Sequence, residues 1–221
     1  MAWPLSVLVA QRAMARYPVP VAQPHAPHES ELLIRRSRFV TRAAHTPGPE
    51  AARAFIEGIR RANADATHNC WAFVAGAPGH TGQIGSSDDG EPHGTAGRPM
   101  LQILLHSGVG EVAVVVTRWF GGVKLGTGGL VRAYQDSVRE NLAGLATLER
   151  VPQVRLRVVL GYAHLDGLHR LLPGFEARIV QEDYLETASL ELLLPDEHCQ
   201  AFTTALAGLS NGAAQCQRAE D

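Results

Sequence analysis

The chain has 221 residues, a length that fits one large domain or two small ones. Its 45% apolar and 19% charged residues are typical of a folded protein and exclude a disordered chain. No apolar run approaches the roughly 18 residues of a membrane-spanning helix, so no membrane association is expected. The formal net charge of −2 does not by itself indicate a nucleic-acid partner.

The three cysteines, Cys70, Cys199 and Cys216, are odd in number and contain no C-x-x-C pair. We therefore expect neither a disulfide framework nor a zinc ribbon, but a cytoplasmic protein with reduced thiols.

Charge is unevenly distributed along the chain. Residues 30–61 hold seven arginines against three glutamates, whereas residues 141–221 hold 6 basic and 11 acidic side chains. A basic face is thus expected in the first part of the chain, while the last third should repel phosphate.

Residues 1–28 do not show the pattern of a folded element. Prolines at positions 18, 20, 24 and 27 interrupt any helix or regular strand. No positive residue precedes the mildly apolar first ten residues, which argues against a signal peptide. The acid-free stretch with Arg12 and Arg16 leaves a transit-like leader as the alternative. We favour a disordered or non-native extension over residues 1–28.

The middle of the chain predicts a domain that spans residues 29–148. Its apolar periodicity indicates mixed strands and helices, and its glycines are concentrated, with 14 of the 22 between Gly76 and Gly129. The expected elements are, in order, one long strand or a strand pair at 32–41, a helix at 50–62, a strand at 68–75, a loop at 76–97, a short helix at 99–106, a strand at 112–117 and a helix at 130–145. Because residues 112–117 are apolar on both faces, that strand should be central in its sheet.

The last third predicts a second, smaller domain at residues 154–221, after a boundary near Pro152. The expected elements are strands at 154–160, 177–182, 188–194 and 213–217, with helices at 165–172 and 196–209. Their order is β-α-β-β-α-β, which is typical of the ferredoxin-like fold. The fold class of the whole chain is therefore α+β.

The most informative motif runs from Thr117 to Tyr134 and contains a glycine-rich loop between a strand and a helix. The first amides of a helix have no internal partner and favour an anion, so the backbone of Gly126, Thr127, Gly128 and Gly129 is a candidate phosphate site. Four cations are expected beside it: Arg98, Arg118, Lys124 and Arg132. The run matches neither a Walker A loop nor a dinucleotide-binding fingerprint. The alternative is a glycine-rich connection needed only for tight packing.

A second motif, residues 85–101, carries the acidic residues Asp88, Asp89 and Glu91. Acidic residues in turns commonly cap nearby amides, which is the interpretation we favour. A divalent metal site that includes His93, or pairing with Arg98 or Arg118, remains open. No catalytic motif was found: Cys70 lies in an expected buried strand, and neither a nucleophile elbow nor a zinc-protease motif is present.

These two motifs resemble the Impact/YigZ family. The segments that carry the resemblance are 87–92 (SDDGEP), 94–101 (GTAGRPML), 118–122 (RWFGG) and 125–131 (LGTGGLV). The similarity extends from about Glu31 to the C-terminus. It implies an N-terminal domain similar to domain 2 of ribosomal protein S5 and a ferredoxin-like C-terminal domain.

The resemblance also bears on function. Eukaryotic members of the family regulate translation initiation by binding a partner of a protein kinase, whereas bacterial members lack the additional N-terminal domain used there. We do not transfer that role, because the residues before Glu31 are too few for such a domain. We expect a translation-associated protein, which we favour as a binding protein over an enzyme and without a cofactor, whose partner is RNA, the ribosome or a translation factor. The alternative is an enzyme or sensor that binds a small phosphorylated ligand, with a divalent metal at the acidic residues.

Overall fold

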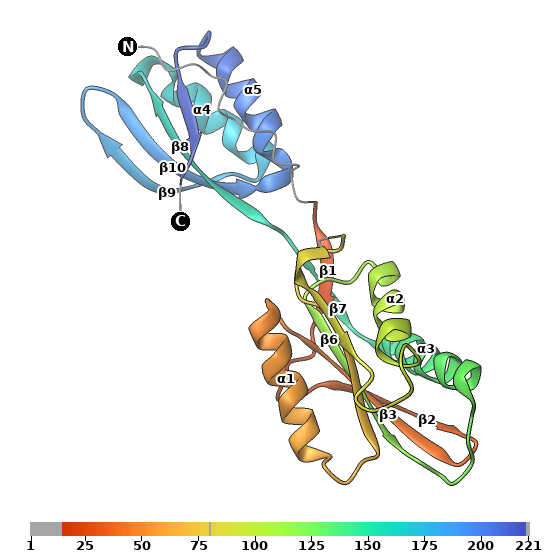
Figure 1. Ribbon diagram of the computed structural model, residues 1–221. Coiled ribbons are helices and arrows are strands. Elements are labelled where there is room, and N and C mark those ends of the chain that lie inside the picture. The colour runs from red at the N-terminus through yellow and green to blue at the C-terminus, as the bar shows by residue number, and fades with distance from the viewer. Residues whose placement is uncertain (1–14, 80, 220–221) are drawn as a thin grey trace. The chain divides into compact units, whose positions relative to one another are not determined.

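The structure is a computed structural model that describes residues 15–79 and 81–219. It consists of two compact units, shown in Figure 1. The N-terminal unit runs from Tyr17 to Arg150, and the C-terminal unit includes residues 151–219. The division falls inside the region 148–154, where the composition changes. No helix in the described ranges is both long and apolar enough to cross a membrane.

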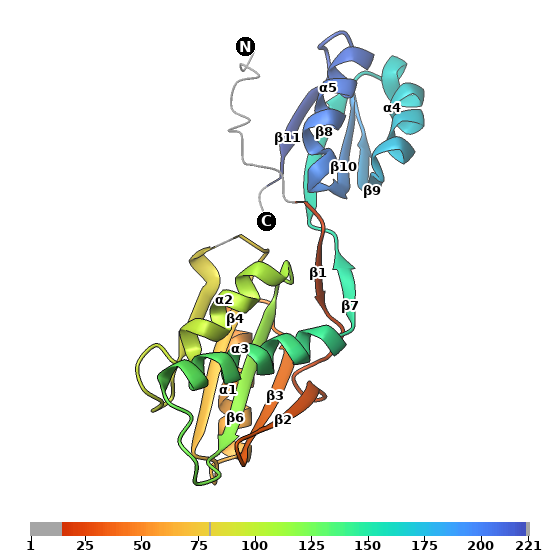
Figure 2. The same cartoon turned by 90° about the vertical axis from the view of Figure 1, so that its right-hand side faces the viewer.

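The N-terminal unit is built on a five-stranded antiparallel sheet with the order β2-β3-β6-β4-β5. Its strands are β2 (His28–Ile34), β3 (Ser37–His45), β4 (His68–Val74), β5 (Ile84–Ser87) and β6 (Val112–Trp119). Three helices cover the sheet: α1 (Pro49–Ala62), α2 (Gly97–Ser107) and α3 (Thr127–Gly144). Helix α1 lies on one face, and α2 and α3 lie side by side on the other (Figures 1 and 2). The expected α+β class is confirmed.

Strand β6 is the centre of this unit, as its sequence predicts. Residues 112–118 are all buried, because α1 covers one face of the strand and α3 the other. The side chains of Val112, Val114 and Val116 join the core beneath α2 and α3, whereas Ala113 and Val115 join the core beneath α1. The β-branched residues that favour strands thus fill both cores.

A separate two-stranded ribbon corrects the expectation for residues 1–28. Strand β1 (Tyr17–Pro20) pairs antiparallel with β7 (Thr147–Arg150), and Val19 is buried. Proline is tolerated here because the ribbon has only two strands, so each keeps an edge where no amide donor is needed. Residues 17–28 are therefore part of the N-terminal unit, and residues 1–14 lie outside the described residues.

The C-terminal unit has the expected ferredoxin-like topology, with the strand order β11-β8-β10-β9. Its elements are β8 (Gln153–Leu160), α4 (Leu165–Leu171), β9 (Arg178–Tyr184), β10 (Ala188–Pro195), α5 (Cys199–Leu209) and β11 (Gln215–Arg218). Alternate residues of β8 and β10 are buried, which places one face of the sheet in the core with Leu168 and Phe202 of the helices. The other face carries polar side chains, including Arg155 and Glu191, which form an ion pair.

Candidate functional site: a buried charge network and an exposed basic surface

The carboxylate of Asp88 caps helix α2. It accepts hydrogen bonds from the backbone amides of Gly94 (2.8 Å), Ala96 (3.0 Å) and Gly97 (2.8 Å). Burial alone would raise the pKa of this carboxyl, but the three amide hydrogen bonds outweigh burial and lower the pKa. The N-terminus of α2 is therefore already occupied by a protein anion, in agreement with the capping interpretation of Asp88.

Asp89 and Glu91 are directed to different partners. Asp89 accepts a hydrogen bond from the amide of Asn69 (2.7 Å) and forms an ion pair with Arg60 (3.2 Å). Glu91 is only 7% exposed and forms an ion pair with Arg118. Across the described residues, no group of three or more potential ligand side chains is close enough to hold a metal ion. The metal interpretation of the acidic residues therefore has no support in the geometry.

Arg118 is buried rather than presented to solvent, with 4% of its surface exposed. Its guanidinium lies 2.6 Å from a carboxylate oxygen of Glu91 and 3.4 Å from the hydroxyl of Ser37. It also lies 5.4 Å from the ring centre of Phe39 and 5.5 Å from that of Phe120. This placement corrects the expectation that Arg118 contacts phosphate, because its charge is neutralised inside the protein.

Tyr134 and Cys70 complete the buried network. The hydroxyl of Tyr134 donates to Glu91 (2.8 Å), and the thiol of Cys70 lies 2.9 Å from the carbonyl oxygen of Asp88. Burial is the main cause that raises the pKa of both Tyr134 and Cys70. Both groups therefore stay protonated at neutral pH, and Cys70 has the properties of a structural thiol rather than a nucleophile.

The remaining candidate residues are exposed, with Arg98 in the first turn of α2, Lys124 before α3 and Arg132 in its second turn. Arg98, Lys124 and Arg132 are exposed and form no ion pair with any other described side chain. Gly126 precedes the helix with a φ of +76°, a left-handed conformation that glycine adopts without strain. Unlike α2, helix α3 has no side-chain cap, and nothing in the described ranges accepts a hydrogen bond from the amides of Thr127, Gly128 or Gly129.

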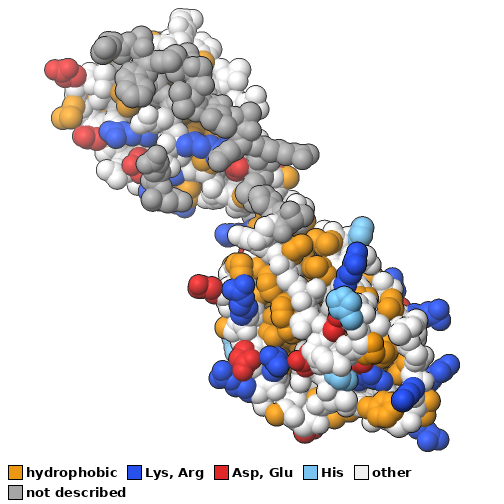
Figure 3. Space-filling view, viewed as in Figure 1, with side chains coloured by type: hydrophobic (Ala, Val, Ile, Leu, Met, Phe, Trp, Pro, Cys, Tyr) orange, Lys and Arg blue, Asp and Glu red, His pale blue; other side chains and the backbone are white. Residues whose placement is uncertain are grey.

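The N-terminal ends of α2 and α3 lie at the same end of the sheet (Figure 2). In the space-filling view, Lys and Arg side chains gather along the edge of this unit where the loop 120–126 leads into α3 (Figure 3). Arg98 thus lies in the first turn of α2, and Lys124 and Arg132 lie on either side of the start of α3; all three are exposed, unlike the buried Arg118.

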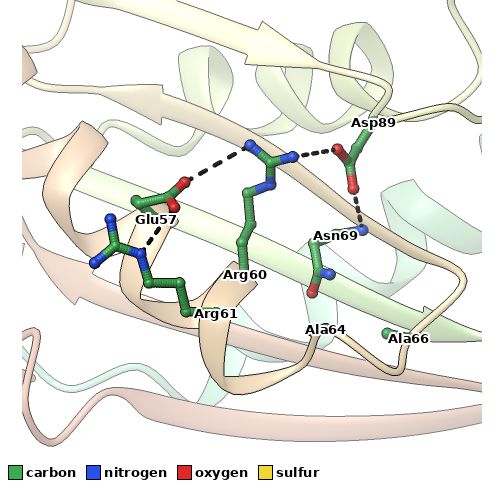
Figure 4. A pocket seen from close by; sticks show the side chains of 7 residues that line it. All are labelled: Glu57, Arg60, Arg61, Ala64, Ala66, Asn69 and Asp89. Carbon is green, nitrogen blue, oxygen red and sulfur yellow. Dashed lines mark hydrogen bonds and ion pairs between the residues drawn. The ribbon is translucent and has the colours of Figure 1, made fainter.

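The structure also shows polar features that were not expected from the sequence. A pocket of about 400 Å³ lies at the C-terminal end of α1, and Arg60 bridges Glu57 and Asp89 at its rim (Figure 4). The residues that line it are Glu57, Arg60, Arg61, Ala64, Ala66, Asn69 and Asp89. Because Arg61 also pairs with Glu57, both cations of this pocket are neutralised by carboxylates. Nothing in the spacing of these residues would have indicated the pocket.

Comparison with known proteins finds a matching domain family for each of the two units. Residues 35–142 match the Impact N-terminal domain, and residues 158–213 match a domain of unknown function, DUF1949. The IMPACT family member YigZ of Escherichia coli (strain K12) is 45% identical over 188 residues, which is 85% of this chain and 92% of that protein. The IMPACT family member YvyE of Bacillus subtilis (strain 168) is 34% identical over 192 residues, or 87% of this chain and 88% of that protein.

A solved structure shares the fold as well. It is described as the crystal structure of a hypothetical protein, and it matches with a TM-score of 0.65 and 42% identity. The match covers 94% of this chain and 99% of that chain. The curated relatives match over most of their own length, and the two domain matches fall in the two structural units. From this agreement of sequence, domain order and fold, we conclude that the chain belongs to the IMPACT family.

Proposed function

We propose that this chain is a non-enzymatic, translation-associated regulator of the cytoplasm that binds RNA, with the ribosome as one source of that RNA. The observation that carries the proposal is the open N-terminal end of α3. Its first three amides have no acceptor in the described part of the chain, and Lys124 and Arg132 beside them have no ion-pair partner there. Phosphate oxygens are the acceptors that such an arrangement favours.

The buried network has a supporting role in this proposal. Arg118 is fixed by Glu91 and Ser37, and Ser37 in turn accepts a hydrogen bond from the amide of Gly121 (3.2 Å). The network therefore holds the beginning of the loop that carries Lys124 toward α3. Arg118 acts as a positioning residue, and the phosphate contacts fall to the exposed cations and the free amides.

A small phosphorylated ligand is the second candidate, because the same free amides would also bind a single phosphate group. The two candidates differ in their response to salt. An extended polyanion releases one counterion for roughly each phosphate contact, so its affinity falls steeply with salt concentration. A small ligand should bind saturably, with chemical selectivity and a modest dependence on salt.

The test is the affinity for unstructured and base-paired RNA at several salt concentrations. We expect weak, salt-sensitive binding by the wild type, and weaker binding by Lys124→Ala and Arg132→Ala across all sequences. Each variant should flatten the plot of log affinity against log salt by roughly 0.7 to 0.9. The control is Arg53→Ala, which removes one exposed cation from α1 on the opposite face of the sheet.

Two results would contradict the RNA proposal. The absence of RNA binding near about 50 mM salt would contradict the proposal, since the electrostatic contribution to affinity is strong at that salt concentration. Selective, saturable binding of one nucleotide or phosphate compound with little salt dependence would favour the small-ligand candidate instead.

A further inference from the structure

The turn between β2 and β3 has an unfavourable sequence for its backbone conformation. Strand residues Ile34 and Ser37 pair with each other, so the turn consists only of Arg35 and Arg36. Both turn residues have positive φ angles, +45° and +68°. Two-residue turns of this kind strongly prefer Asn-Gly, because a side chain such as arginine is strained in the left-handed region. The chain therefore accepts strain at the position where it places two adjacent cations.

Both arginines of the turn are available for a partner. Arg35 and Arg36 are exposed, and neither forms a salt bridge with another described residue. The next cation, Arg38, is paired with Glu31 at 2.9 Å and lies over the ring of Trp119 at 4.9 Å. The turn thus carries positive charge with no ion-pair partner among the described residues, whereas the charge of Arg38 on the following strand is neutralised by Glu31.

The backbone of Phe120 and Gly121 is held from two sides, and Gly121 packs against this turn. Its backbone amide donates to the hydroxyl of Thr67 (3.0 Å), and the amide of Gly121 donates to the hydroxyl of Ser37 (3.2 Å). Gly121 packs so closely on the turn that a Cβ there would collide with the carbonyl oxygen of Arg36. The backbone of Phe120 is therefore fixed, although the residue remains 46% exposed.

An exposed aromatic residue with a fixed backbone, whose neighbour Gly121 packs on a turn of two unpaired arginines, has the chemistry of a site for single-stranded nucleic acid. Aromatic side chains stack with unpaired bases, and nearby cations contact the phosphates between them. In a duplex the base faces are stacked on each other and are not available to Phe120. An acidic protein partner would use the cations equally well but would not need a planar ring with a fixed backbone.

We propose that Arg35, Arg36 and Phe120, together called the turn–ring surface, bind single-stranded RNA. One unpaired base stacks on Phe120, and the neighbouring phosphates pair with Arg35 and Arg36. The inference rests on the RNA binding proposed above and specifies its substrate class as unpaired rather than double-stranded RNA. It also adds Arg35 and Arg36, which lie far in sequence from the start of α3, and Phe120, which begins the loop that leads to it.

The experiment measures the affinity of the full chain for a short unstructured RNA of mixed sequence and for the same sequence as a duplex. Phe120→Ala should weaken binding of the single strand about tenfold and leave duplex binding unchanged. Phe120→Tyr keeps the ring and should retain the wild-type affinity. The double variant Arg35→Asn, Arg36→Gly should also weaken single-strand binding, while its preferred turn residues raise the melting temperature by about 3 °C.

The outcomes separate this inference from the proposed function. Preference for the single strand that is lost in Phe120→Ala and restored in Phe120→Tyr supports the turn–ring surface. Equal affinity for both RNAs, sensitive to Lys124→Ala but not to Phe120→Ala, would overturn the inference and leave the proposed function in place. No binding of either RNA would overturn both. Capture of an acidic protein in preference to RNA, with the ring dispensable, would also overturn the inference.

Discussion

At the scale of single residues, the ion pair of Arg118 and Glu91 is the feature that organises the N-terminal unit. Both side chains are almost fully buried, so each has lost its hydration. The pair offsets that loss through a 2.6 Å contact, and Tyr134 supplies a further hydrogen bond to the carboxylate. The consequence is asymmetric: the pair as a whole adds little stability, whereas the loss of one member leaves an unpaired charge in the core.

We predict that Glu91→Gln destabilises the protein by about 3 kcal/mol, because the buried guanidinium of Arg118 loses its counter-charge. The measurement is chemical unfolding followed by the fluorescence of Trp71 and Trp119, which lie in the same unit. As a control, the double variant Glu91→Met, Arg118→Met should be more stable than Glu91→Gln, since it removes both charges. A change below about 0.5 kcal/mol in Glu91→Gln would refute the role of the pair.

At the scale of elements, Asp88 determines where α2 begins. It lies nine residues before Gly97, yet its carboxylate accepts hydrogen bonds from the amides of Ala96 and Gly97 at the start of that helix and of Gly94 in the loop before it. The 11-residue helix packs against β4, β5 and α3, and its first residue, Gly97, lies so close to Ser87 that a Cβ there would collide with the backbone of Ser87. A single carboxylate thus links the strand end at Ser87 to the helix that follows.

We predict that Asp88→Ala lowers the free energy of unfolding by about 1–2 kcal/mol at neutral pH, because three amides lose their acceptor. The pKa of Asp88 is lowered in the folded state, so its contribution is present above the unfolded pKa of about 4. The contribution is lost as pH falls through the lower, folded pKa. Unfolding measured from neutral to acidic pH should show the wild type and the variant converging at the acidic end.

Asp88→Asn and added magnesium are the controls for this prediction. The asparagine side chain has one acceptor oxygen and no charge, so it can replace only part of the hydrogen bonding. The free energy of unfolding of Asp88→Asn should therefore lie between those of the wild type and Asp88→Ala at neutral pH. Magnesium should not stabilise the wild type, because the carboxylate is already used. A magnesium-dependent rise in melting temperature that disappears in Asp88→Ala would restore the metal interpretation.

Comparison of expected and observed elements shows what local pattern can indicate. The apolar stripe of α1, the two-sided burial of β6 and the whole order of the C-terminal unit were predictable, because each follows from the spacing of apolar residues. The sequence of Ile84–Ser87, with a glycine and two serines, predicts a loop, whereas the structure has strand β5 there, because its pairing with β4 is decided by tertiary contacts.

The candidate site was predictable to a smaller degree. Glycine content identified the loop before α3, and the capping role of Asp88 followed from its place in a turn. The burial of Arg118 could not be predicted from the sequence, because its partner Glu91 lies 27 residues away and only the folded sheet brings the two side chains together. The backbone strain at Arg35 and Arg36 could not be predicted from the sequence either, since it depends on the register of β2 and β3.

At the scale of the whole molecule, the two units have separate cores. Among the described residues, the buried residues of the C-terminal core come from 154–206, and those of the two N-terminal cores come from 39–145. Each unit thus buries its own apolar surface, which is the main favourable contribution to folding. We therefore expect two cooperative transitions rather than one.

We predict that Leu192→Ala, at a fully buried position of β10, destabilises the C-terminal unit alone by about 3 kcal/mol. Its transition should shift down by roughly 10–20 °C in calorimetry, given the small size of that unit. The transition reported by Trp71 and Trp119 should stay in place. If both transitions moved together, the two units would have to be coupled in folding.

The position of β6 within the chain has a consequence for synthesis. Residues 112–117, Val-Ala-Val-Val-Val-Thr, are uncharged and mostly β-branched, which is the composition of a segment prone to aggregate when it is unpaired. Its two neighbours in the sheet, β3 and β4, both precede it in sequence. Because a chain emerges from the ribosome N-terminus first, both templates are present when this segment appears, and its exposure as a free strand is brief.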